Sequence, residues 1–134
     1  MSDTTAPVPQ YAGTLIERMG IEVIEASAQR VVGTMPVAGN TQPYGLLHGG
    51  ASAVLAETLG SIAAMAHAGE GRAAVGIELN ATHHRSARSG IVTGPATALH
   101  LGGRLATYQV VVEDEDGRPV CTARLTCMVI DARP

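Results

Sequence analysis

Apolar and polar positions along the chain follow two periods, which predict six strands, one long helix and one short helix. Two alternating segments precede residue 40 and four follow residue 72, whereas the stretch near residue 58 is almost uniformly apolar. We predict helices at Tyr11–Met19 and from about His48 to His67, and strands at Ile21–Ala26, Arg30–Val37, Ala73–His84, Gly90–Leu101, Leu105–Glu113 and Val120–Ile130. One long helix among strands indicates the α+β class.

The long helix carries almost no charge, which predicts that it is buried on nearly all sides. From Gly49 to Gly69 its ionisable side chains are Glu57 and His67. A single sheet covers one face of a helix only, so we expect a second copy of the chain to cover another. We reject a membrane span, because a central carboxylate costs roughly 2.5 to 3.5 kcal/mol on insertion scales and large apolar residues are too few to offset it.

Composition and charge narrow the classes of function. The 134 residues are 46% hydrophobic and 16% charged, which fits a single packed domain at residues 11–134 rather than a disordered chain. Residues 1–10 hold an aspartate, two prolines and no cation, so we expect a flexible tail without an export signal. The net charge of −3 and the absence of Phe and Trp argue against nucleic-acid binding.

Neither cysteine indicates a disulfide or a metal site. Cys121 and Cys127 belong to one predicted strand, where six residues span about 20 Å at roughly 3.3 Å each, beyond disulfide reach. Their neighbours form no metal or redox motif, so we expect structural thiols, no metal and a cytoplasmic location.

Glu57 is the most informative single residue. It lies among aliphatic residues with no cation in the helix to pair with it; unpaired carboxylates in such places are costly and concentrate at functional sites. Ser61 follows at i+4, where its hydroxyl shares the same helix face. The structural alternative is a cation from elsewhere, such as Arg85 or Arg124, or plain solvent exposure.

The start of the helix supplies further candidates. His48-Gly49-Gly50 leads into a first turn whose N–H groups lack partners within the helix and, with the helix dipole, favour negative charge. A carbonyl oxygen held against the Gly49 N–H would be polarised, and glycine permits close approach. Gln42 offers a side-chain donor, while His48 has either a catalytic role or a structural role at the helix start.

Together these residues resemble the hotdog-fold acyl-CoA thioesterases, in the 4-hydroxybenzoyl-CoA and phenylacetate-pathway branch whose catalytic carboxylate is a helix glutamate. The motifs that carry the resemblance are Gln42, His48-Gly49-Gly50, Leu55-Ala56-Glu57 with Ser61, Asn80–Arg85 and Leu99–Gly102. The resemblance implies a long helix wrapped by a curved antiparallel sheet. It also implies a homodimer, commonly paired into a homotetramer, whose sites join the Glu of one subunit to the Gln and Gly donors of the other.

The implied reaction is hydrolysis of an acyl-CoA thioester, often an aromatic one, with no cofactor besides the coenzyme A of the substrate. The Gly49 N–H and Gln42 would polarise the thioester carbonyl. Glu57 would act as nucleophile or as general base toward a water, and Ser61 would position that water or the carboxylate. The thiol leaving group has a pKa near that of cysteine, about 8.5, and so needs no strong general acid.

Coenzyme A phosphates need donors, and arginine is well suited to them. The expected substrate contacts are Arg85, Arg88, Gly102, Gly103 and Arg104, with solvated turn cations as the alternative. Adjacent residues of a strand face opposite sides, so only one of His83 and His84 should reach the pocket, and we choose His83.

Other functions are possible on this fold. A hydratase or dehydratase that uses a helix Glu pairs it with a His in a His-Phe-Pro loop, but this chain has no Phe. The thioesterase branch with an early catalytic Asp fits poorly, because Asp3 is the only Asp before Asp114. A non-catalytic acyl-CoA-binding dimer would not need Glu57.

Overall fold

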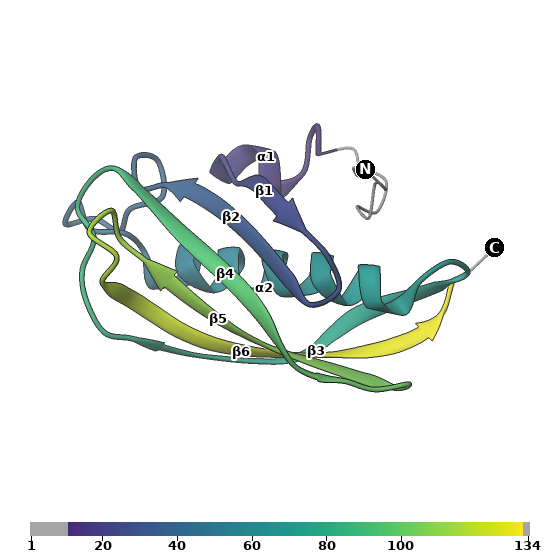
Figure 1. Cartoon of the computed structure of the whole chain (residues 1–134). Helices are drawn as coiled ribbons and strands as arrows, with labels where there is room; N and C mark the ends of the chain where they lie inside the picture. The colour runs from purple at the N-terminus through teal and green to yellow at the C-terminus, as the bar shows by residue number, and fades with distance from the viewer. Residues whose placement is uncertain (1–10, 133–134) are drawn as a thin grey trace.

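One curved antiparallel sheet encloses a long helix, as a computed structural model of the chain shows for residues 11–132 (Figure 1). In chain order the elements are α1 (Leu15–Met19), β1 (Glu22–Ala26), β2 (Arg30–Pro36), α2 (Gly49–Ala68), β3 (Arg72–His83), β4 (Ile91–Leu101), β5 (Leu105–Glu113) and β6 (Pro119–Asp131). The sheet order is β1-β2-β4-β5-β6-β3, so β1 and β3 form its edges. The predicted α+β architecture, a long helix wrapped by a sheet, is confirmed.

Each strand and the long helix begin and end within one residue of the prediction. The first helix is the exception, because it covers Leu15–Met19 and not Tyr11–Met19. Gly13 has a φ of 78°, a left-handed value that a right-handed helix does not contain. The tail predicted for residues 1–10 lies outside the described residues.

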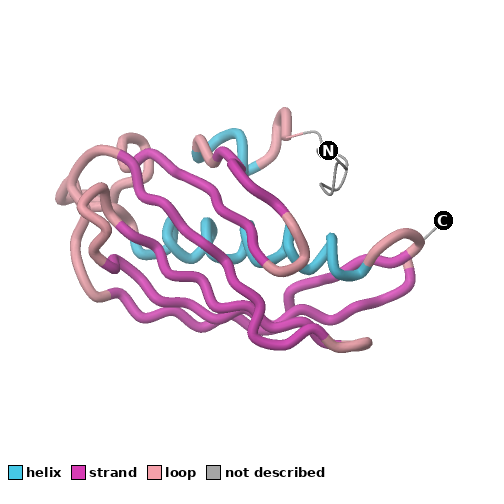
Figure 2. The backbone as a smooth tube through the Cα atoms, viewed as in Figure 1, coloured by secondary structure: helices cyan, strands magenta, loops and turns pink. Residues whose placement is uncertain are grey.

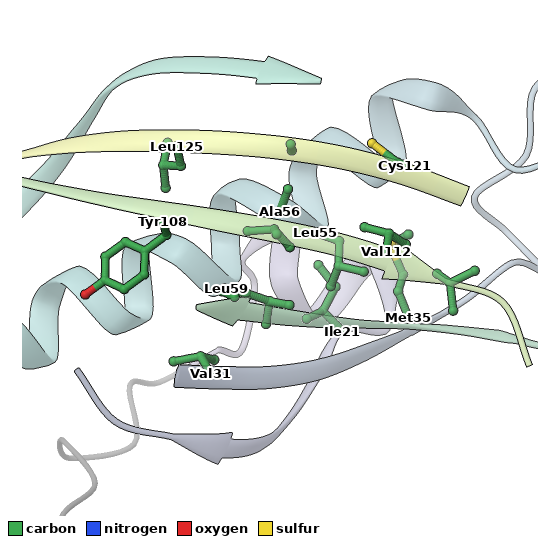
Figure 3. Packing of buried hydrophobic residues seen from close by; sticks show 14 of the residues in the cluster. Ile21, Val31, Met35, Leu55, Ala56, Leu59, Tyr108, Val112, Cys121 and Leu125 are labelled. Atoms are coloured by element: carbon green, nitrogen blue, oxygen red, sulfur yellow. The ribbon is translucent and has the colours of Figure 1, made fainter. Parts of the chain in front are cut away.

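The core lies between α2 and the concave face of the sheet (Figure 3). Leu59 of α2 fits against Gly33 of β2 and Gly94 of β4, which face each other in register. A Cβ on Gly33 would come within 2.5 Å of Leu59 Cδ2, and one on Gly94 within 3.0 Å of Leu59 Cδ1. These glycines therefore let the helix approach the sheet closely.

In the single chain α2 is buried on one side only. Its buried residues are Ala51, Ser52, Leu55, Ala56, Leu59, Gly60, Ala63 and Ala64. The helix is long and apolar enough to pass as a membrane span by length and composition, but it is the core helix of this sheet. The sheet contacts one face of the helix, and coverage of the other face by a second copy stays a prediction.

Strand β3 is the least buried strand of the sheet. It contains no buried residue, and Val75 and Ile77 are 44% and 51% exposed. One edge of β3 pairs with β6, with an irregularity between Gly76 and Glu78. No other strand within residues 11–132 pairs with its second edge.

Three loops meet at the end of the molecule where α2 begins (Figure 2). The Leu47 N–H donates to the Ala87 carbonyl at 2.8 Å, which ties the segment before α2 to the β3–β4 connection. The Ile91 N–H donates to the Glu115 carboxylate at 3.2 Å, which ties that connection to the β5–β6 hairpin. These contacts hold the loops around the helix N-terminus.

Candidate active site

A cleft of about 390 Å³ opens beside the N-terminus of α2. Its lining is Gln42, Leu46, Leu47, Gly49, Ser52, His83, His84, Arg85, Ser86 and Val120. The structure thus gathers four predicted site residues from three segments of the chain: Gln42, Gly49, His83 and Arg85.

Two hydrogen-bond donors are available at this cleft. Gly49 is the first residue of α2, so its N–H has no acceptor inside the helix, and no acceptor elsewhere in residues 11–132 takes it. The Gln42 Oε1 accepts hydrogen bonds from the N–H groups of Tyr44 and Leu46. Because these bonds occupy the carbonyl side of the amide, its NH₂ is left as the donor toward the cleft.

His48 caps the helix. Its backbone is extended, and its Nδ1 accepts a hydrogen bond from the Gly50 N–H at 2.8 Å. An accepting Nδ1 carries no proton, so the imidazole proton of the neutral ring lies on Nε2. Of the two roles that the sequence left open, the contacts of His48 show capping.

Both histidines at the end of β3 reach the cleft, so the prediction that only one would do so is wrong. A Cβ at Gly49 would lie 2.9 Å from His83 Nε2, so the His83 ring lies against the helix start and leaves no room for a side chain there. The His84 Nε2 contacts Thr122 Oγ1 at 2.9 Å. The rule that neighbouring side chains of a strand face opposite sides does not apply to His84, because β3 ends at His83.

Glu57 is not part of this cleft within one chain. It lies eight residues after Gly49, about 12 Å along the helix at 1.5 Å per residue. Its side chain is exposed, and none of the ion pairs formed within residues 11–132 involves it, which excludes Arg85 and Arg124 as partners in the described chain. Of the two structural alternatives for Glu57, a cation partner or solvent exposure, the single chain shows solvent exposure.

Glu57, Ser61 and Cys127 lie close together. Burial raises the pKa of the Cys127 thiol above its ordinary value, the charge of Glu57 adds to the rise, and a hydrogen bond with Ser61 opposes it. Both cysteines are buried and free, as predicted. The nearness of Cys127 to Glu57 was missed, because it depends on the register that places Cys127 opposite Gly76, and the sequence does not reveal that register.

The remaining predicted contacts divide between two ends of the molecule. Arg85 lines the cleft, whereas the exposed Arg88 of the same connection does not. The Gly102–Arg104 turn is at the far end of α2, where the Gly102 carbonyl contacts His67 Nε2 at 2.6 Å. His67 is 18 residues beyond Gly49, or about 27 Å along the helix. The structure does not bring this turn to the cleft of the same chain.

The described part of the chain contains no cluster of three His, Cys, Asp or Glu side chains that could hold a metal ion. The chemistry available at the helix start is therefore that of hydrogen-bond donors, two imidazoles and one guanidinium. Such a set can polarise a carbonyl group and hold an anion.

Comparisons with known proteins agree with this arrangement. The model of the thioesterase superfamily matches residues 44–121. The proofreading thioesterase EntH of Klebsiella pneumoniae subsp. pneumoniae is 49% identical over 118 residues, which cover 87% of this chain and 86% of that protein. The crystal structure of thioesterase HI1161 from Haemophilus influenzae has a TM-score of 0.86 at 38% identity, over 90% of this chain and 85% of that one.

A more distant structure has the same fold. A hypothetical thioesterase protein with coenzyme A from Streptococcus pneumoniae TIGR4 has a TM-score of 0.78 at 21% identity, over 89% of this chain and 93% of that one. The residues matched by the superfamily model include α2, β3, β4 and β5, together with all of the cleft lining except Gln42. The chain therefore belongs to the thioesterase superfamily, has its hotdog fold, and is a thioester hydrolase.

Proposed function

We propose that the protein hydrolyses acyl-CoA thioesters, preferentially with aromatic acyl groups, at a site shared by two subunits. The observation that carries the proposal is the separation of the free donors at Gly49 and Gln42 from the exposed carboxylate of Glu57. About 12 Å of helix lies between them, so one chain cannot apply both to the same carbonyl. A second copy that presents its Glu57 to the cleft completes the site.

Each group then has a defined task. The Gly49 N–H and the Gln42 amide donate to the thioester oxygen and stabilise the negative charge that develops on it. Glu57 of the other subunit attacks the carbonyl carbon to form an anhydride, or removes a proton from a water that attacks it. The C–S bond breaks, and the sulfur leaves as a thiolate. Ser61, one turn from Glu57, positions the water or the carboxylate.

The edge of β3 is the surface best suited to join the subunits. It is long, its second edge has no partner among the described strands, and it lies on the side of α2 where Glu57 emerges. We propose that two copies pair there and that such dimers associate into a homotetramer. This pairing also covers part of the α2 face that the sheet leaves open.

Substrate recognition follows from the cleft. Arg85 and the imidazoles of His83 and His84 supply donors for coenzyme A phosphates or the acyl group. A role for Arg88 and for the Gly102–Arg104 turn would require the second subunit to bring them near. The chemistry asks for no cofactor other than the coenzyme A of the substrate, and we place the enzyme in the cytoplasm.

The similarity to proofreading thioesterases supports a more specific role. On this basis we propose that the protein removes unwanted thioesters. A broad acyl range with an aromatic preference is the pattern expected of such a role here.

The first test is the release of thiol from a panel of aryl- and alkyl-CoA esters by the wild type and by Glu57→Gln. The amide keeps the size of the side chain and removes its negative charge. We expect kcat to fall by roughly 10²-fold or more, at least as much as removal of one oxyanion donor, with KM nearly unchanged. Benzoyl-type esters should be cleaved faster than palmitoyl-CoA.

Two results would contradict the proposal. Equal rates for the wild type and Glu57→Gln would remove Glu57 from the chemistry. Faster hydrolysis of palmitoyl-CoA than of every aryl-CoA ester would reject the aromatic preference while leaving the role of Glu57 intact.

A further inference from the structure

The carboxylate of Glu57 lies directly over one residue of the sheet. Gly76 of β3 faces α2, opposite Cys127 of β6 in register, just before the irregularity that ends at Glu78. A Cβ built on Gly76 would collide with Glu57 Oε2. The carboxylate oxygen thus occupies the place where any other residue would carry its first side-chain atom.

The backbone does not explain why glycine is found here. Gly76 is absent from the glycines with positive φ, so an L residue fits its conformation. The remaining neighbours leave ordinary space, because the next closest atom to a Cβ is Leu125 Cδ1 at 3.4 Å. Only the carboxylate of Glu57 excludes a side chain at this position.

The carboxylate lies beside buried side chains and forms no ion pair. Leu125 and Cys127 are fully buried beneath it, whereas the Glu57 side chain itself is exposed and forms no ion pair with the described residues. A long side chain that no ion pair holds would sample several rotamers. The gap at Gly76 offers one defined place for its end.

We infer that Gly76 is a positioning residue, which holds the Glu57 carboxylate against the β3 backbone at the height needed to reach a bound thioester. The inference rests on the proposed role of Glu57 and adds a residue that sets its geometry. Misplacement of a reacting group by about 1 Å can cost 10²-fold in rate. Because the excluded atom belongs to the flexible end of a side chain, displacing it should disturb catalysis and spare the fold.

The test is a double-mutant cycle of Gly76→Ala and Glu57→Asp, with kcat, KM and Tm measured for all four proteins. In the wild-type background we expect Gly76→Ala to lower kcat by about 10- to 100-fold with KM within about twofold and Tm unchanged or slightly raised. In the Glu57→Asp background, Gly76→Ala should lower kcat by less than about threefold, because the shorter Asp side chain no longer reaches the position of the added methyl group.

Val111→Ile serves as the matched control, since it adds one methyl group at a half-buried position of β5, outside the site and outside β3, and should leave kcat unchanged. The inference would be overturned if Gly76→Ala lowered kcat by the same factor in both backgrounds. A large fall in Tm, or a rise in KM with constant kcat, would also overturn it. Glu57→Gln separates the two proposals. If it is inactive while the cycle is additive, only the role of Gly76 fails; if it is fully active, the role proposed for Glu57 fails.

Discussion

Tyr108 is the largest fully buried side chain (Figure 3), and its hydroxyl donates to the Ala28 carbonyl at 2.7 Å. Burial, with a smaller contribution from the charge of Cys127, raises the pKa of Tyr108 from 10.0 to about 12. Between these two pH values the unfolded chain loses the phenolic proton and the folded chain keeps it. The group therefore stabilises the fold below pH 10, and this stabilisation is lost as the pH rises through 12.

We expect the free energy of unfolding to fall between pH 10 and 12, by about 2 to 3 kcal/mol from this group, given two pKa units at 1.36 kcal/mol each. Urea unfolding at several alkaline pH values measures the slope. Tyr108→Phe should be less stable at pH 8, because the Ala28 carbonyl loses its partner, and should show a shallower slope. Identical slopes for the two proteins would show that Tyr108 does not cause the loss.

For single residues, the sequence indicated which side chains belong to the candidate site better than it indicated what surrounds them. Glu57 was chosen because an unpaired carboxylate is unusual in an apolar helix, and Gln42 because its amide could donate near the helix start; Gln42 does line the cleft. Whether Glu57 is exposed, or whether His48 caps rather than catalyses, depends on contacts that only the folded chain defines. Gly76 gave no signal, because a glycine in a strand is read as a local weakness of that strand.

Close approach between α2 and the sheet depends on glycines of both. A Cβ at Gly60 of α2 would lie 2.6 Å from Leu125 Cδ2, and Leu125 is fully buried. Gly60→Ala should therefore lower the free energy of unfolding by up to about 2 kcal/mol, because overpacking costs roughly 1 to 3 kcal/mol and the gain in helix propensity offsets about 1 kcal/mol of it.

Chemical denaturation of the Gly60→Ala protein measures this loss. Adding Leu125→Val, which shortens the opposing side chain, should cost less in the Gly60→Ala background than in the wild type. If the Gly60→Ala protein were as stable as the wild type, α2 and β6 could move apart to fit the methyl group without loss of free energy of unfolding.

The elements themselves followed closely from the sequence. Alternation and turn residues give strand boundaries to within one residue, because half-buried strands display their two faces directly. Register does not follow, since pairs such as Gly76 with Cys127 are set by the bulges and by the fit of α2 against several strands at once. The first helix was predicted too long because the left-handed backbone of Gly13 keeps the helix from beginning before Leu15.

At the scale of the whole molecule, a shared site makes a prediction that a self-contained site does not. Gln42→Ala removes a donor from one half of the site, and Glu57→Gln removes the carboxylate from the other. Each homodimer should be impaired by 10²-fold or more. A heterodimer of the two variants, co-expressed with different tags and purified through both, holds one intact site of two and should regain about half of the wild-type kcat.

The heterodimer of wild-type and Glu57→Gln chains provides the control, since it also retains one intact site. Activity of the mixed mutant heterodimer no greater than that of its parents would place both groups in one chain. A protein that is monomeric by light scattering and fully active would likewise exclude the shared site.

The unpaired second edge of β3 also affects how newly synthesised chains behave before they assemble. A freshly made copy exposes the second edge of the twelve-residue strand β3, together with Val75 and Ile77, and such an edge is a template for indiscriminate pairing. Glu78 is an acidic residue on β3 and discourages stacking of many identical strands through mutual repulsion. We therefore expect the yield of soluble protein to depend on how many unpaired chains are present at once, so rapid synthesis at high concentration would favour precipitation over assembly.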